Sequence, residues 1–244
     1  MFLLLWKGRP FAFQAVQFMY VLLFDIDGTL LSSGGAGQAA MEAALLQEFG
    51  HDRPATGLTT AGRTDYAITS ELFAHYGLAL DEPTWRRFQE TYFELLPSHL
   101  AGKSGLVLPG VLHLLELLAA REDVAVGLLT GNFERGAWLK LKHFAIEHHF
   151  TFGSYGDHHS SRDDVARQAL RHIQREHPGV PVERIWVIGD TPADIQCARA
   201  IGAKVLAVAT GLFTAAELAA HQPDLLRDTL ANPEAWLPVM LPPG

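Results

Sequence analysis

The chain has 244 residues, of which 48% are hydrophobic and 19% charged, a balance typical of a folded globular protein. With 19 lysines and arginines against 27 aspartates and glutamates, its net charge of −8 disfavours nucleic acid and anionic membrane surfaces as partners. No apolar run approaches the roughly 18 residues of a membrane span. The single cysteine, Cys197, excludes an internal disulfide and a multi-cysteine zinc site. A reducing, cytoplasmic location fits these features best.

The N-terminal segment, residues 1–19, begins with apolar residues and then carries Lys7 and Arg9. A secretory signal has its positive charges before the apolar stretch, so this segment is not expected to be one. We interpret it as an N-terminal extension with no assigned role, and Met19 as an alternative start of the chain.

Four short apolar runs predict strands, and each ends at or near a polar residue or a glycine. Continuous apolar runs of this length suit strands that are buried on both faces, hence a parallel sheet. Helical patterns lie between the later runs, so we expect a doubly wound, Rossmann-like α/β core. The predicted strands are 21–24, 124–129, 185–188 and 205–209, and the predicted core helices are 111–120, 162–176 and 192–201.

The connection after the first strand departs from this alternation. Residues 31–106 contain no strand-like run of comparable quality, but they contain three helical patterns, at 37–49, 64–76 and 83–100. Glycines flank this segment on both sides, which favours a small helical cap domain on flexible connections. We therefore assign residues 20–33 and 105–244 to the α/β core and residues 34–104 to the cap.

Charged residues follow the first predicted strand in the sequence Asp25-Ile26-Asp27-Gly28-Thr29-Leu30. In open α/β sheets, ligands bind at the carboxyl ends of the strands. An Asp-Gly turn explains Asp27 but leaves Asp25 unexplained, and uncompensated carboxylates are costly to bury. This strand end is therefore a candidate site.

Two other strand ends carry matching groups. Thr130-Gly131-Asn132 offers a hydroxyl, an amide and backbone N–H groups at a predicted helix start, which suits a phosphate. In Gly189-Asp190-Thr191-Pro192-Ala193-Asp194, helix capping explains Thr191, Pro192 and part of Asp194. Capping leaves Asp190 unexplained, and a carboxylate at this sheet edge suits a hard cation such as Mg²⁺.

Together these three motifs resemble the haloacid dehalogenase-like hydrolase superfamily, in particular its phosphoglycolate phosphatase-like members with a helical cap. The resemblance covers about residues 20–228. It implies a phosphatase that acts on a small phosphorylated metabolite and uses Mg²⁺. In that interpretation Asp25 is the nucleophile and Asp27 the general acid and base. Asp25, the backbone carbonyl of Asp27, and Asp190 would hold the metal.

The remaining assignments follow from the same resemblance. Thr130 would fix the phosphoryl oxygens with help from Gly131 and Asn132. Asp194 either supports the residues that contact the substrate and the metal, or is only a helix cap. Family members place a lysine before the last motif, but no lysine stands between 155 and 164. Arg162 is the expected substitute.

Three other cationic residues stand outside these motifs. Lys140 and Lys142 are expected on an exposed helix face. In the insert, Arg63 either belongs to an ordinary loop or reaches the substrate as a specificity residue.

Several functions share these motifs. Asp27 argues against a dehalogenase, whereas a β-phosphoglucomutase-like phosphotransferase would have all the core motifs. A catalytically silent scaffold that binds a phosphorylated ligand is a further alternative, although it would need neither nucleophile nor acid. The sequence predicts neither the physiological substrate, phosphoglycolate-like or a sugar phosphate, nor the oligomeric state.

Overall fold

The computed structural model describes residues 20–51 and 60–242, so the N-terminal extension lies outside the described residues. The centre of the fold is a six-stranded, all-parallel sheet with the strand order β5-β4-β1-β6-β7-β8. The predicted doubly wound α/β fold is confirmed. The strands are β1 (Tyr20–Phe24), β4 (Val124–Leu129), β5 (Gly153–Ser154), β6 (Ile185–Gly189), β7 (Lys204–Val208) and β8 (Leu225–Arg227).

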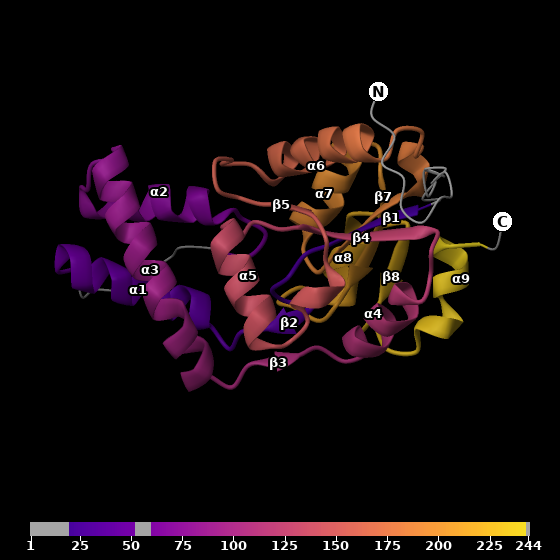
Figure 1. Cartoon of the computed structure of the whole chain (residues 1–244), viewed down its shortest axis with the longest axis horizontal. Coiled ribbons are helices and arrows are strands. Elements are labelled where there is room, and N and C mark those ends of the chain that lie inside the picture. Colours follow the sequence, from indigo (N-terminus) through magenta and orange to yellow (C-terminus); the bar gives the residue numbers. More distant parts are fainter. Residues whose placement is uncertain (1–19, 52–59, 243–244) are drawn as a thin grey trace, which may run out of the picture.

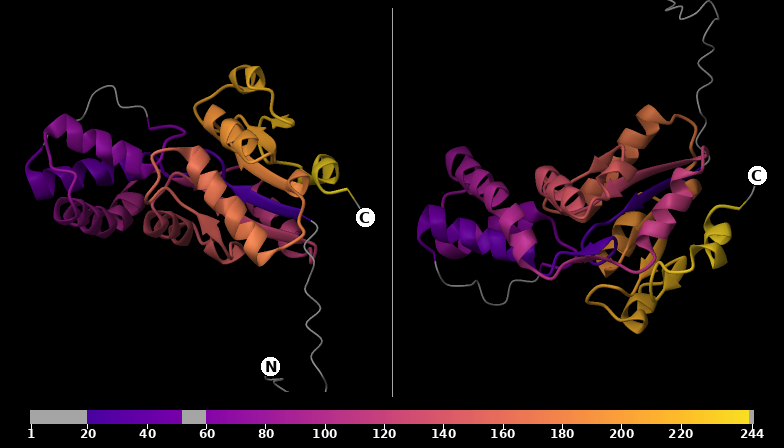
Figure 2. Two further views of the ribbon diagram at one scale, coloured as in Figure 1. Left: turned by 90° about the horizontal axis from the view of Figure 1, so that it is seen from above. Right: turned by 60° about the horizontal axis from the view of Figure 1, so that its bottom comes forward.

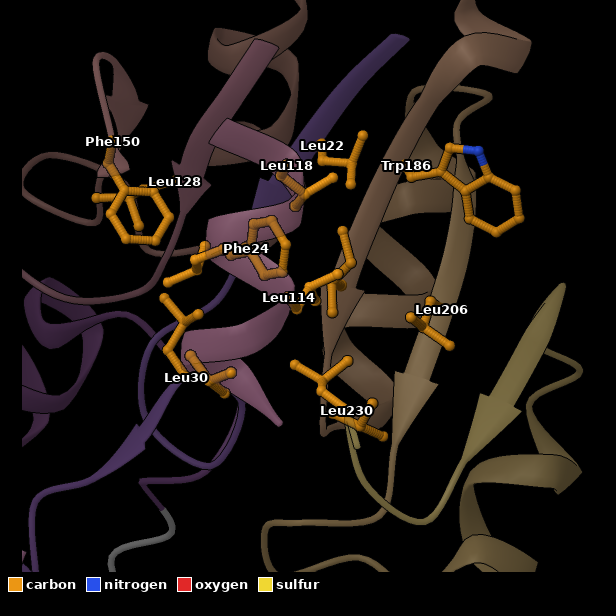
Figure 3. Packing of buried hydrophobic residues seen from close by; sticks show 14 of the residues in the cluster. Leu22, Phe24, Leu30, Leu114, Leu118, Leu128, Phe150, Trp186, Leu206 and Leu230 are labelled. Atoms are coloured by element: carbon orange, nitrogen blue, oxygen red, sulfur yellow. The ribbon is translucent and has the colours of Figure 1, made fainter. Parts of the chain in front are cut away.

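Helices cover both faces of this sheet (Figure 1). Successive side chains of a strand point to opposite faces, so the wholly apolar β1 is buried on both. Leu22 and Phe24 pack against Leu114 and Leu118 on one face (Figure 3). The core helices are α4 (Val111–Ala119), α5 (Glu134–His143), α6 (Arg162–Glu176), α7 (Pro192–Ala200), α8 (Ala215–Ala220) and α9 (Leu237–Met240).

The opposite face of the sheet is covered mainly by α6 and α7. Val21 and Leu23 of β1 belong to a cluster with Val165 of α6 and Ile195 of α7. Among the short elements, the 3-10 helices are η1 (Glu147–His149), η2 (Val182–Arg184) and η3 (Pro233–Ala235). The sequence analysis missed β5 and β8, which have only two and three residues.

The insert forms three helices that lie together at one end of the molecule, as Figures 1 and 2 show. They are α1 (Ala36–Phe49), α2 (Asp65–Tyr76) and α3 (Glu82–Gly102). Their apolar side chains form a separate cluster, which Phe133 of the core joins. At its base, β2 (Leu31–Ser32) and β3 (Leu106–Val107) pair antiparallel, a two-residue ribbon that the sequence did not predict.

In the described residues, none of the helices combines the length and the apolar character needed to cross a membrane.

Candidate active site

The site lies at the carboxyl ends of three neighbouring strands. Asp25 follows β1, Thr130 follows β4 and Asp190 follows β6, and β1 pairs with both of the other strands. All three side chains are buried, with exposed fractions of 6%, 0% and 3%. A cavity of about 450 Å³ opens here between core and insert. Its lining includes Asp25, Asp27, Arg63, Asp65, Tyr92, Gly131, Asn132, Lys140, Arg162 and Asp190.

Glycines allow the chain to approach Asp190 closely. Gly28 has a positive φ of 84°, and a Cβ at this position would lie 2.3 Å from the Asp190 Oδ2. A Cβ on Gly211 would lie 1.7 Å from the same oxygen. Any larger residue would collide with this carboxylate, so both glycines are required by its position.

Arg162 supplies the cation beside Asp25. The side chain begins α6 and is buried, and its Nη1 donates to Asp25 Oδ1 at 3.1 Å. Its Nη2 donates to Asp194 Oδ1 and to the carbonyl of Leu129. The guanidinium therefore bridges two carboxylates in the geometry that a forked donor allows and a point charge does not. The structure thus places Arg162 beside Asp25, and its function as the substitute for the family lysine stays a prediction.

Asp194 both caps α7 and supports Arg162. Its Oδ2 accepts hydrogen bonds from the backbone N–H and the hydroxyl of Thr191, at 3.0 and 2.7 Å, in a capping box. Its Oδ1 accepts from Arg162. The two interpretations of Asp194 are therefore compatible, and both of its oxygens already have protein partners.

The carboxylates at this edge fit a divalent cation. Ligand oxygens of Asp25, Asp190 and Asp194 lie within 4.8 Å of one another. Burial raises the pKa of Asp25 although Arg162 opposes it, and burial together with the carboxylates of Asp194 and Asp25 raises the pKa of Asp190. Arg162 alone therefore leaves the cluster short of positive charge, which a Mg²⁺ held by Asp25 and Asp190 would supply.

Asp27 is held by a cation that the sequence analysis placed incorrectly. Lys140 was expected on an exposed helix face, but only 4% of it is exposed. Its Nζ donates to Asp27 Oδ2 at 2.5 Å and to Asn132 Oδ1 at 2.6 Å. The expectation failed because the face of α5 that carries Lys140 is covered by α3, which belongs to the insert. Lys142 is exposed, as predicted.

This surrounding sets the charge state of Asp27. Burial raises the pKa of the carboxyl, but the Lys140 ammonium and hydrogen bonds from Lys140, Asn132 and Ser33 outweigh it. The pKa of Asp27 therefore lies below its usual value.

The predicted phosphate-binding turn is built as a compact unit. Thr130 is buried, and its Oγ1 accepts hydrogen bonds from the Asn132 backbone N–H at 3.3 Å and from its Nδ2 at 2.8 Å. The same Nδ2 also donates to Asp27 Oδ2 at 3.0 Å. A Cβ on Gly131 would lie 2.1 Å from the Arg63 carbonyl oxygen, so the insert packs directly on this turn.

Arg63 lies at the rim of the cavity in the described structure. Its Nη1 pairs with Glu71 Oε2 at 2.6 Å, and 32% of its side chain is exposed. Because exposed ion pairs contribute little, this pair does not commit Arg63 to a purely structural function.

Asp65 and Tyr92 of the insert also line the cavity, and the sequence analysis assigned no site function to either. Asp65 is buried and accepts a hydrogen bond from the Phe133 N–H at 2.9 Å, while its own N–H donates to the Gly131 carbonyl at 2.7 Å. Burial raises the pKa of Asp65 to about 6, although Lys140 opposes the effect. Tyr92 is fully buried. An acid in the first turn of a helix and an aromatic at core spacing carry no local signal of a site.

The fold and the site define a class of protein: a Rossmann-like α/β domain with paired carboxylates at a strand end and a helical insert over them. The family model for haloacid dehalogenase-like hydrolase matches residues 22–199. The chain therefore belongs to the haloacid dehalogenase-like hydrolase family.

Similar proteins agree with this membership. The chain is 29% identical over 215 residues to a phosphoglycolate phosphatase of Chromobacterium violaceum, with 86% of this chain and 92% of that protein covered. It is 29% identical over 198 residues to a phosphoglycolate phosphatase of Rhodospirillum rubrum, covering 78% of this chain and 79% of the other.

Two solved structures show the same fold. A predicted phosphoglycolate phosphatase from Haemophilus somnus has a TM-score of 0.69 and 20% identity, with 91% of this chain and 98% of that chain covered. CbbY from Rhodobacter sphaeroides in complex with phosphate has a TM-score of 0.68 and 20% identity, with 88% and 96% covered. At this identity they establish the fold only.

Proposed function

We propose that the chain is a Mg²⁺-dependent phosphatase that hydrolyses a small phosphate monoester through an aspartyl-phosphate on Asp25. One observation carries the proposal: two carboxylates of the first strand end face the same cavity, and each has its own buried cation. Asp25 is paired with Arg162, and Asp27 is paired with Lys140. This arrangement suits two different functions, with Asp25 as the nucleophile and Asp27, two residues later, as the general acid and base.

The chemistry follows in two steps. An Asp25 carboxylate oxygen attacks phosphorus, the bond from phosphorus to the ester oxygen breaks, and Asp27 gives its proton to the leaving oxygen. Asp27 then takes a proton from water, and the water oxygen attacks phosphorus and releases Asp25 and inorganic phosphate. A phosphate bound beside Asp27 raises the pKa of this acid, which opposes the effect of Lys140.

Positive charge is needed because an anionic nucleophile approaches an anionic substrate. Arg162 supplies part of it permanently from the protein. A Mg²⁺ held by Asp25, Asp190 and the backbone carbonyl of Asp27 would neutralise charge on the phosphoryl oxygens. Thr130, with Gly131 and Asn132, would orient those oxygens.

Helices α1–α3 act in this proposal as the cap that selects the substrate. The core residues all address the phosphoryl group, so discrimination between esters comes from the part of the cavity that the insert lines. The relatives named above are phosphoglycolate phosphatases, which supports a short carboxylated ester as one candidate substrate.

The test is release of inorganic phosphate from p-nitrophenyl phosphate and from a set of phosphorylated metabolites, with and without Mg²⁺. We expect activity that EDTA abolishes, and an Asp190→Asn variant that needs much more Mg²⁺ for half-maximal rate. Asp164→Asn is the control, because this aspartate of α6 is half-exposed and, among the described residues, forms its ion pair with Arg167. Full activity in EDTA, or an unchanged Mg²⁺ titration for Asp190→Asn, would contradict the proposal.

A further inference from the structure

Tyr92 brings a buried hydroxyl to the cavity lining. The hydroxyl of Tyr92 is buried and makes no hydrogen bond among the residues that the structure describes. The ring is fixed, since it stacks on Phe88 at a centroid distance of 6.1 Å and meets Phe133 edge-on at 6.1 Å. A buried hydroxyl without a partner is costly, and a tyrosine hydroxyl that is only structural gains nothing over phenylalanine.

A second donor faces the same place. Lys140 has three N–H donors, and two of them are used by Asp27 and Asn132. A Cβ added at Gly37 of α1 would lie 3.4 Å from the Lys140 Nζ and 4.0 Å from the Tyr92 hydroxyl. Both donors therefore lie beside Gly37, and the glycine leaves this point between core and insert without a side chain.

We infer that this point, bordered by Gly37, Tyr92 and Lys140, is a subsite for a hydroxyl group on the leaving alcohol of the substrate. The inference rests on the proposed function. The Tyr92 hydroxyl and the third Lys140 N–H donate to the oxygen of that hydroxyl. The substrate class is a short-chain phosphate ester that carries a hydroxyl next to the ester carbon, as polyol and sugar phosphates do.

The position of the subsite along the substrate follows from Asp27. This acid must touch the ester oxygen, and the Lys140 Nζ lies only 2.5 Å from its Oδ2. A group that contacts Lys140 therefore belongs to the part of the leaving alcohol near the ester oxygen.

Charge favours a hydroxyl over a carboxylate at this point. Lys140 is already paired with Asp27, and the carboxylates of Asp65 and Asp27 lie close enough to the Tyr92 hydroxyl to act on its pKa. A carboxylate would add a third negative charge to this surrounding, whereas a hydroxyl adds none. Burial, Asp65 and Asp27 raise the pKa of Tyr92, so the hydroxyl remains a donor at neutral pH.

The experiment compares three substrates with one two-carbon skeleton: ethyl phosphate, 2-hydroxyethyl phosphate and 2-phosphoglycolate. For Tyr92→Phe we expect kcat/KM on 2-hydroxyethyl phosphate to fall about threefold to tenfold, the effect of one neutral hydrogen bond. The kcat/KM for ethyl phosphate stays unchanged, and the kcat/KM for 2-phosphoglycolate falls less than that for 2-hydroxyethyl phosphate. The melting temperature does not fall, because the hydroxyl has no protein partner to lose. Tyr66→Phe, a change in the insert outside the cavity lining, is the matched control.

A second variant blocks the subsite without removing a donor. Gly37→Ala adds a methyl group at the shared point, and its nearest contact of 3.4 Å is ordinary van der Waals distance. We expect the same selective loss on 2-hydroxyethyl phosphate. Gly102→Ala, another helical glycine with nothing within 4 Å of an added Cβ, serves as the control.

The outcomes separate the subsite from the reaction. If the unmodified enzyme hydrolyses none of the three esters with Mg²⁺, the proposed function fails. If it hydrolyses them but Tyr92→Phe loses activity equally on ethyl phosphate, or on none, or mainly on 2-phosphoglycolate, then the hydroxyl subsite is wrong and the phosphatase stands.

Discussion

Replacing Arg162 by methionine should strongly destabilise the folded protein. The guanidinium is 6% exposed and is the buried partner of both Asp25 and Asp194. Methionine keeps much of the apolar volume of the side chain but leaves these two carboxylates facing each other without a cation. Removing one member of a buried ion pair costs about 3–5 kcal/mol, because the remaining charge is left uncompensated.

The measurement is the free energy of unfolding by urea in EDTA, since a bound cation would replace part of the lost charge. Arg167→Met is the matched control: the same substitution on the same helix, in an ion pair whose side chains are both 49% exposed. The control should lose at most about 0.5 kcal/mol. Arg162→Lys should recover only part of the stability, because one ammonium cannot reproduce the fork. If Arg162→Met and Arg167→Met differ by less than about 1 kcal/mol, the buried bridge does not stabilise the site as argued.

Three further predictions concern the residues that surround the cavity. Burial raises the pKa of Asp65 from 3.8 to about 6, so its contribution to stability is lost as pH rises through this range. The free energy of unfolding of Asp65→Asn relative to the parent should therefore rise by up to about 3 kcal/mol between pH 4 and 6 and then level off; a pH-independent difference would contradict the raised pKa. Arg63→Ala should lower kcat/KM for 2-phosphoglycolate by roughly tenfold to a hundredfold and leave p-nitrophenyl phosphate nearly unchanged, as expected for a charge-assisted hydrogen bond. Equal losses on both substrates would make Arg63 structural. Lys140→Met should slow 2-phosphoglycolate hydrolysis by about tenfold or more because Asp27 loses a charge-assisted hydrogen bond that fixes its carboxylate, whereas the exposed Lys142→Met should not; matching effects would place Lys140 outside the site.

The part of the site that the sequence predicted consists of residues whose position the parallel sheet determines. Asp25, Thr130 and Asp190 follow strands that are apolar throughout, so the strand ends could be read and their convergence expected. Arg162 was expected for a different reason: the resemblance places a cation before the last motif, and Arg162 stands there at the start of α6.

The part that the sequence did not predict depends on packing between core and insert. Lys140 looks like one of several exposed charges of α5, but α3 packs on this helix and the ammonium pairs with Asp27. Asp65 and Tyr92 belong to helices whose local patterns are explained by capping and by core packing. Both residues reach the cavity only through the tertiary packing of the insert on the core, which no periodicity in the insert predicts.

The most direct test of the central claim is a pre-steady-state measurement on Asp27→Asn with p-nitrophenyl phosphate and Mg²⁺. This leaving group needs little help from an acid, whereas breakdown of the aspartyl-phosphate needs the base that the variant lacks. We predict a burst of about one p-nitrophenolate per enzyme followed by slow turnover. Peptide mass spectrometry after an acid quench should find one phosphoryl group on Asp25. Phosphate release without a burst, or a burst that persists after Asp25→Asn, would contradict the account.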